Sequence, residues 1–155
     1  MDSESPDLNL VHVVVLRPKK SDPMSTRLFY LFQELGKLLS SFLPDSMAIE
    51  QPFVSRNVRS AMSIGQAQSV AMIAAASVGI EITGYSPSQV KQSVTDYGAS
   101  SKEQVQEMVK LLLGYGEPMV LDESDALAAA ICHAQYRGSP TSQLMEDLYR
   151  KANGR

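Results

Sequence analysis

The sequence has few of the features that would tie a protein to a membrane or to a disulfide scaffold. It contains a single cysteine, Cys132, in 155 residues, which excludes a disulfide framework and fits a small packed side chain in a reducing cytosol. No apolar run approaches the roughly 20 residues of a membrane span. The opening residues, MDSESPDLN, are acidic and polar, so they predict neither a signal peptide nor a transit peptide. We therefore expect a cytoplasmic protein without membrane association.

An excess of positive charge is missing as well. The formal net charge is −3, whereas DNA-binding domains are usually basic on at least one face. The bulk charge thus speaks mildly against nucleic-acid binding, and such a function must rest on local features. The content of 44% hydrophobic and 20% charged residues predicts one soluble domain over residues 1–155. A domain of this length can bury a core without disulfides or structural metals.

Strand and helix patterns alternate along the chain. Leu8–Pro18 is rich in β-branched residues and predicts a strand, as do Met47–Glu50 and Ile80–Gly84. Apolar residues at helical spacing, together with start and stop signals, predict helices over the remaining segments: Ser25–Phe42, Asn57–Gly79, a short one near Pro87, one opened by the capping-box pattern Ser100 to Glu103, Asp122–Arg137 and Pro140–Asn153. The mixture predicts an α/β fold.

The helix predicted over Asn57–Gly79 has an unusual composition. Its residues are mostly alanine, serine, glycine and methionine, with apolar groups on more than one face. A helix of this kind is expected to be buried on two sides. We expect one side to pack on the sheet and the other on a further surface, such as a second subunit.

Three carboxylates stand at the ends of predicted elements. Glu50 ends an apolar strand, and Asp122 and Asp125 are one turn apart on one face of a predicted helix. Each has an ordinary explanation: Glu50 as a polar strand end, Asp122 as an N-cap, and Asp125 as a charge favoured by the helix dipole.

Taken together, the three carboxylates also fit a metal site. If Glu50, Asp122 and Asp125 converge, their oxygens suit Mg²⁺, which keeps several waters and needs few protein ligands. Two such ions can hold a phosphate, generate the attacking hydroxide and stabilise the leaving oxygen. The residues alone thus lead to the hypothesis of a metal-dependent phosphoryl-transfer site.

Three blocks of the sequence closely resemble signature blocks of the RuvC family, the bacterial Holliday-junction resolvases. They are AIEQPFVSRNVRSAMSIGQAQSVAMIAA, PSQVKQSVTDYGASSKEQVQEMV and DESDALAAAICHA, in the family's order and with agreeing gaps. With a weaker match at LRPKKSDPMSTRLFYLFQELGKLL, the resemblance covers about Leu8 to Gly138, which leaves residues 139–155 as a C-terminal helix or tail.

The resemblance implies a fold, an activity and partners. The family has a ribonuclease-H-like mixed sheet of five strands flanked by helices, and it works as a homodimer on four-way DNA junctions. It nicks two opposed strands with Mg²⁺, two ions per complete site, held by four acidic residues. A branch-migration helicase complex is an implied partner.

Carried over by motif, the resemblance assigns roles to single residues. Glu50 of AIEQ matches the second acid, and Asp122 and Asp125 of DESDALA match the third and fourth. Lys91 of QVKQ and Lys102 of SSKEQVQ match basic residues near the DNA and the active site. Lys102 would also lie at a helix N-terminus, where the dipole favours a phosphate, although a solvated lysine remains the alternative.

Three further residues fall near the start of the long predicted helix. Phe53 of EQPF matches an aromatic position that contacts or unstacks bases near the crossover, but a core phenylalanine fits the sequence equally well. Arg56 and Arg59 could meet backbone phosphates or simply aid solubility.

The sequence departs from the family at its start. The family's GIDPG strand, which carries the first acid, and its TGYG strand have no counterpart here, so the resemblance implies three of four metal ligands. The missing strand is central in the family's sheet, so we expect Leu8–Pro18 to pair directly with Met47–Glu50, or the sheet to be incomplete. We expect little or no junction cleavage, from a late-assigned start codon or a truncated gene. The rival is a divergent, non-catalytic paralogue that binds junctions and dimerises.

Overall fold

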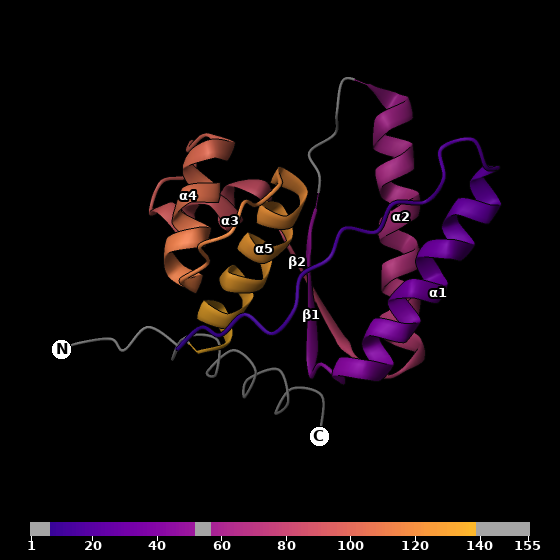
Figure 1. Ribbon diagram of the computed structural model, residues 1–155, viewed down its shortest axis with the longest axis horizontal. Helices are drawn as coiled ribbons and strands as arrows, with labels where there is room; N and C mark the ends of the chain where they lie inside the picture. Colours follow the sequence, from indigo (N-terminus) through magenta and orange to yellow (C-terminus); the bar gives the residue numbers. More distant parts are fainter. Residues whose placement is uncertain (1–6, 52–56, 139–155) are drawn as a thin grey trace, which may run out of the picture. The chain divides into compact units, whose positions relative to one another are not determined.

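The structure, a computed structural model, describes residues 7–51 and 57–138. Contacts divide the chain into two compact units (Figure 1). The strand unit is Val13–Pro87, and the helical unit comprises the described parts of Met1–His12 and Ser88–Arg155. The helix expected at Pro140–Asn153 lies outside the described residues. Each unit is described by itself below.

The strand unit contains two helices and two strands in alternation. Their order is α1 (Met24–Phe42), β1 (Ser46–Glu50), α2 (Val58–Ser77) and β2 (Glu81–Tyr85). The two strands are parallel, with Ser46 opposite Glu81 and Glu50 opposite Tyr85. Helix α2 packs against both α1 and β2, and Figure 1 shows α1 and α2 side by side. Parallel pairing brings the carboxyl ends of both strands to the same edge.

Local signals explain where these helices begin and end. Asn57 is the N-cap of α2, and its side-chain oxygen accepts a hydrogen bond from the Ser60 backbone N–H at 3.3 Å. Gly79 follows the helix with a φ of +75°, a left-handed conformation that glycine adopts without steric cost. Leu43, the C-cap of helix α1, is also left-handed, and its N–H donates to the Leu39 carbonyl. All four elements of this unit match their predicted ranges to within two residues.

The strand predicted at Leu8–Pro18 is wrong. Residues 8–18 carry no strand, and the sheet within the described residues has only two members, β1 and β2. Two outcomes were expected for this segment. Residues 8–18 do not pair with Met47–Glu50, so the outcome is the incomplete sheet. The physical reason is that β-branched side chains favour extended backbone, but a strand also needs a neighbour that accepts and donates its ladder of hydrogen bonds.

The helical unit contains α3 (Pro87–Thr95, all but its first residue), α4 (Lys102–Leu113) and α5 (Leu121–Arg137). Helix α5 supplies most of the buried residues, and α4 packs against it. The buried apolar side chains of the three helices are Val90, Val94, Val105, Val109, Leu127, Ala128, Ala129, Ile131 and Cys132. Cys132 is packed, as predicted, with its sulfur 3.9 Å from the Gln89 carbonyl. None of the described helices is long and apolar enough to cross a membrane.

The start of α4 differs by one residue from its prediction. Ser101, not Ser100, is the N-cap: its hydroxyl accepts from the Gln104 N–H at 3.1 Å, and the Gln104 side chain accepts from the Ser101 N–H at 2.8 Å. This reciprocal pair is a capping box. Ser100 is instead buried and bonds to the preceding turn.

Candidate active site

Glu50 is the last residue of β1 and is half-buried. The backbone around it is held from two sides. The Gln68 side chain on α2 donates to the Glu50 carbonyl at 2.6 Å, and the Gln51 N–H donates to the Tyr85 carbonyl at 2.7 Å. The end of the strand is therefore fixed by α2 and by β2, so the position from which the carboxylate projects is set by the strand unit alone.

Asp122 and Asp125 both lie near the start of α5, as predicted, but Asp122 does not cap the helix. The N-cap is Val120, and the carboxylate of Glu123 accepts a hydrogen bond from the Val120 N–H at 3.0 Å. Valine has no side-chain acceptor for the first N–H groups of the helix, so only the Glu123 half of a capping box is formed. Asp122 is exposed, and its side chain makes no hydrogen bond within the described residues. The capping explanation for Asp122 is thus wrong.

Asp125 is paired with Lys102. The Lys102 ammonium lies 3.1 Å from the Asp125 Oδ2 atom and donates a hydrogen bond to it. The two side chains are 57% and 34% exposed, so solvent screens the pair and its contribution to stability is small, about 0–1 kcal/mol. The contact nevertheless brings a predicted DNA-facing lysine and a predicted metal ligand together.

Hydrogen bonds hold the two helices that carry this pair. The capping box of Ser101 and Gln104 fixes the first turn of α4, where Lys102 lies. One turn later, the Gln106 side chain donates to the Met119 carbonyl at 2.6 Å, which ties the segment before α5 to α4. The two backbone positions are therefore set by hydrogen bonds other than the ion pair itself.

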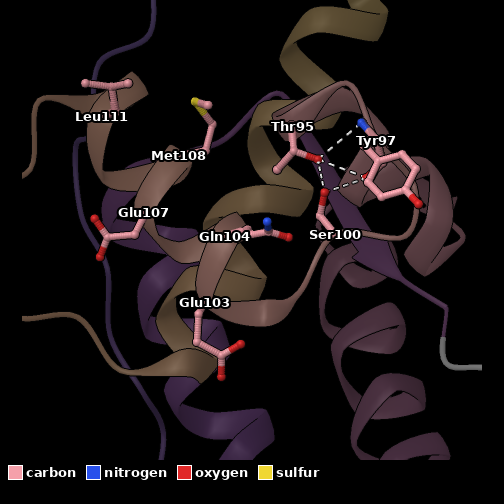
Figure 2. Close-up of a pocket in the computed structure, with 8 residues that line it drawn as sticks. All are labelled: Thr95, Tyr97, Ser100, Glu103, Gln104, Glu107, Met108 and Leu111. Carbon is pink, nitrogen blue, oxygen red and sulfur yellow. Dashed lines mark hydrogen bonds between the residues drawn. The ribbon is translucent and has the colours of Figure 1, made fainter.

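Lys91 lies on α3, and a hydroxyl network links its helix to α4. The Thr95 hydroxyl donates to the Lys91 carbonyl at 2.8 Å and lies 2.7 Å from the Ser100 hydroxyl, which also contacts the Tyr97 carbonyl. Figure 2 shows the Thr95 and Ser100 hydroxyls close together, with dashed lines from both to the Tyr97 backbone. Because one network joins the end of α3 to the start of α4, it holds the helices of Lys91 and Lys102 in register.

A groove runs from this turn along α4 (Figure 2). Its volume is about 680 Å³, and the described residues that line it are Thr95, Tyr97, Ser100, Glu103, Gln104, Glu107, Met108 and Leu111. The two glutamates give it negative charge, and no lysine or arginine is in its lining. A phosphate would be repelled there, so the groove does not belong to the candidate DNA site.

The predicted site draws residues from both units. Glu50 belongs to the strand unit, while Lys91, Lys102, Asp122 and Asp125 belong to the helical unit, so the convergence of the three carboxylates stays a prediction. Within the described residues, no group of three or more histidine, cysteine, aspartate or glutamate side chains lies close enough to hold a metal ion.

The residues between β1 and α2 are only partly described. Phe53 and Arg56 lie outside the described residues, and their roles stay predictions. Arg59 is exposed in the first turn of α2, so it is accessible to a phosphate or to solvent, as both predictions for it required.

The helical unit's share of the candidate metal site fits a cation. Asp125 already holds a positive group, the Lys102 ammonium, at one of its oxygens. Asp122, one turn earlier on the same helix, offers a second exposed carboxylate. Hard oxygen donors of this kind are what Mg²⁺ prefers, so the chemistry of these residues is compatible with the metal that the resemblance implies.

Three features of the site were not predicted from the sequence. The Lys102 and Asp125 pair spans 23 residues, a separation at which no local pattern reports contact. Gln106 reaches the Met119 carbonyl across 13 residues, which is also beyond any local pattern. Only Glu123 had a readable signal, since it stands three residues after Val120, the spacing of a capping glutamate.

Comparison with known proteins decides the family. The sequence profile described as "Crossover junction endodeoxyribonuclease RuvC" matches residues 1–133. The chain belongs to the RuvC family. A RuvC of Dehalococcoides mccartyi is 42% identical over 138 residues, which cover 88% of this chain and 84% of that protein. A RuvC of Brevibacillus brevis is 41% identical over 138 residues, covering 88% and 83%.

Solved structures of the RuvC family agree with this membership. The chain matches Thermus thermophilus RuvC with a TM-score of 0.76 and 32% identity, over 83% of this chain and 78% of that one. It also matches T. thermophilus RuvC in complex with a Holliday junction substrate, with a TM-score of 0.79 and 32% identity, over 84% and 79%. The α/β fold is thus the ribonuclease-H-like fold of RuvC, as predicted.

Proposed function

We propose that this RuvC protein is a structure-specific DNA endonuclease that resolves four-way junctions in recombination and repair, with residues 1–155 forming one nuclease domain in the cytoplasm. Family membership over residues 1–133 supports the assignment. The observation that supports this assignment from the chain's own residues is the contact between Lys102 and Asp125. A metal-dependent phosphodiesterase needs a carboxylate that binds the cation next to a positively charged side chain that binds the phosphate.

The carboxylates of Glu50, Asp122 and Asp125 would hold Mg²⁺, two ions in the complete family site. When bound, the metal supplies charge for the attacking and leaving oxygens of phosphodiester hydrolysis. Lys91 and Lys102, from α3 and α4, bind and orient the phosphate. Phe53 and Arg56 would contact bases and backbone near the crossover.

A homodimer is the second part of the proposal, because two opposed strands require two sites related by a twofold axis. Helix α2 supports it. Its residues Met62, Ser69, Ile73 and Ala76 recur at i, i+7, i+11 and i+14, so they share one face, and all four are exposed. Met62 is 60% and Ile73 61% exposed. A second copy of this face would cover them, and a branch-migration helicase complex would act on the same DNA.

The runner-up is a non-catalytic, junction-binding and dimerising RuvC paralogue. Such a protein would bind a four-way junction without cleaving it.

A paired assay on a four-way junction tests both readings. Gel shifts in Ca²⁺ or EDTA measure binding, and denaturing gels in Mg²⁺ measure symmetric nicking. Junction binding without nicking supports the paralogue, while nicking that is lost in Asp125→Asn supports the nuclease and removes the expectation of weak activity. Absence of any preference for a junction over duplex DNA contradicts both.

A further inference from the structure

The ion pair between Lys102 and Asp125 has a strength and a location that allow exchange. Its ammonium lies 3.1 Å from one carboxylate oxygen, and the side chains are 57% and 34% exposed. Solvent reaches both partners, so the pair is screened and forms or breaks at little cost. A cation that competes for the same oxygen therefore has only a weak ion pair to displace.

The two partners differ in how far they can move. Asp125 has a short side chain on α5, and the start of that helix is tied to α4 through Gln106 and Met119. Lys102 has a flexible four-carbon stem on a helix turn fixed by its capping box. If the pair breaks, the carboxylate stays in place and the ammonium swings away.

We propose that Lys102 is the resident counter-cation of Asp125 in the metal-free protein and that a divalent cation displaces it. The inference rests on the proposed function's assignment of Asp125 as a metal ligand. A divalent ion binds carboxylate oxygens at about 2.0–2.6 Å, so at Asp125 it would compete with the ammonium for the lone pairs of the same carboxylate. The two positive charges also repel each other at such short range.

Displacement gives the lysine a second task. Once released from Asp125, the ammonium remains on the first turn of α4, where the helix dipole already favours an anion. From there it can turn toward a phosphate bound beside the metal. By linkage, a metal that releases Lys102 raises the protein's affinity for phosphate. A phosphate that draws Lys102 away from Asp125 raises the protein's affinity for the metal by the same factor.

Metal binding by the full chain, without DNA, tests the exchange. Mn²⁺ is titrated into wild type, Lys102→Met and Lys110→Met, and free Mn²⁺ is measured by its EPR signal. Lys110 lies in the last turn of α4 and serves as the matched loss of one charge on the same helix. We expect Lys102→Met to bind Mn²⁺ about threefold or more tightly than wild type, and Lys110→Met to remain within twofold.

A second readout follows the lysine itself. The acetylation rate of Lys102 is measured by mass spectrometry with and without Mg²⁺. Wild type should acetylate faster when Mg²⁺ is added, whereas Asp125→Asn should be fast from the start and respond little to Mg²⁺. Lys110 in the same digests gives the internal control.

The outcomes separate this inference from the proposed function. If Mn²⁺ binds but Lys102→Met binds it equally or more weakly, or Lys110→Met gains as much, the exchange is refuted and the metal site stands. If wild type and all variants fail to bind Mn²⁺ at millimolar concentration, the metal-dependent function is refuted and the exchange with it.

Discussion

Buried apolar side chains are concentrated in the helical unit, whereas the strand unit exposes many of its own. Among the described apolar residues of the strand unit, only Leu39, Ala74, Ala75 and Tyr85 are buried. Its helices expose large side chains, among them Phe29, Phe32, Met62, Met72 and Ile73. Exposed apolar surface on this scale is typical of a face that another surface covers. The contrast suggests that the helical unit is organised around its own packing and the strand unit around association.

The largest expected effect tests which side of α2 serves the fold. Ala75 has no exposed surface, so Ala75→Glu buries an unpaired charge and should cost about 3 kcal/mol or more in the free energy of unfolding. Ile64 is 44% exposed on the same helix, and Ile64→Glu is the matched control. Urea denaturation measures both. A charge at Ala75 therefore reports on folding and not on association, because it would unfold the unit first. Equal costs in the two variants would show that α2 has no distinct inner face.

The next effect concerns the outer face of α2. Ile73→Glu places a charge at a side chain that is 61% exposed, so it should leave folding nearly unchanged but weaken self-association at least tenfold, because a charge would be desolvated between two copies. Sedimentation velocity over a concentration series measures the change. Ile64 lies well away from this face at 100° per residue, and Ile64→Glu should retain the wild-type dimer. A dimer that survives Ile73→Glu would move the interface elsewhere.

A smaller effect is expected inside the helical unit. The Ser124 hydroxyl is fully buried, with no hydrogen-bond partner in the structure. An unsatisfied buried hydroxyl costs free energy, so Ser124→Ala should stabilise the protein by about 1 kcal/mol. The control is Ser93→Ala, which removes a hydroxyl that donates to the Val90 carbonyl at 2.8 Å and should gain less. Calorimetry of the three proteins would contradict the prediction if Ser93→Ala gained as much.

The smallest expected effect concerns the rate at which the Cys132 thiol is alkylated. Burial raises the pKa of the Cys132 thiol, and a hydrogen bond with Ser93 only partly offsets this. At pH 8.5 an unperturbed thiol is about half ionised, but Cys132 should remain largely protonated and react slowly with iodoacetamide. In urea the rate should rise to that of a free cysteine. Fast alkylation of the folded protein would mean that the helical core opens readily.

The spacing of apolar residues predicted those helices and strands whose ends are set by nearby residues. The ranges of α1, β1, α2, β2 and α5 agree with their predictions to within two residues, because apolar spacing and stop signals act over a few residues. The failure at Leu8–Pro18 has the opposite cause. A strand needs a partner that the segment itself does not contain.

The candidate site was predictable in kind but not in its contacts. The sequence pointed to Glu50, Asp122 and Asp125 as carboxylates at element ends, and the structure confirms that Glu50 ends β1 and that the two aspartates begin α5. It gave no indication that Lys102 would pair with Asp125, 23 residues away, because such a contact arises only from the packing of α4 on α5. Glu50 belongs to the strand unit, whereas Asp122 and Asp125 belong to the helical unit. No contact within a single unit therefore sets the distance between Glu50 and the two aspartates.

Helix α4 has a consequence for the path of any polyanion along the helical unit. Lys102 is followed at once by Glu103, which lies 100° around the helix, and Glu107 extends the same acidic side along the groove. A phosphate backbone drawn toward the ammonium thus meets repulsion as soon as it drifts toward the groove. If a strand binds at Lys102 as proposed, attraction at that residue and repulsion at Glu103 and Glu107 would together restrict its sideways movement across α4.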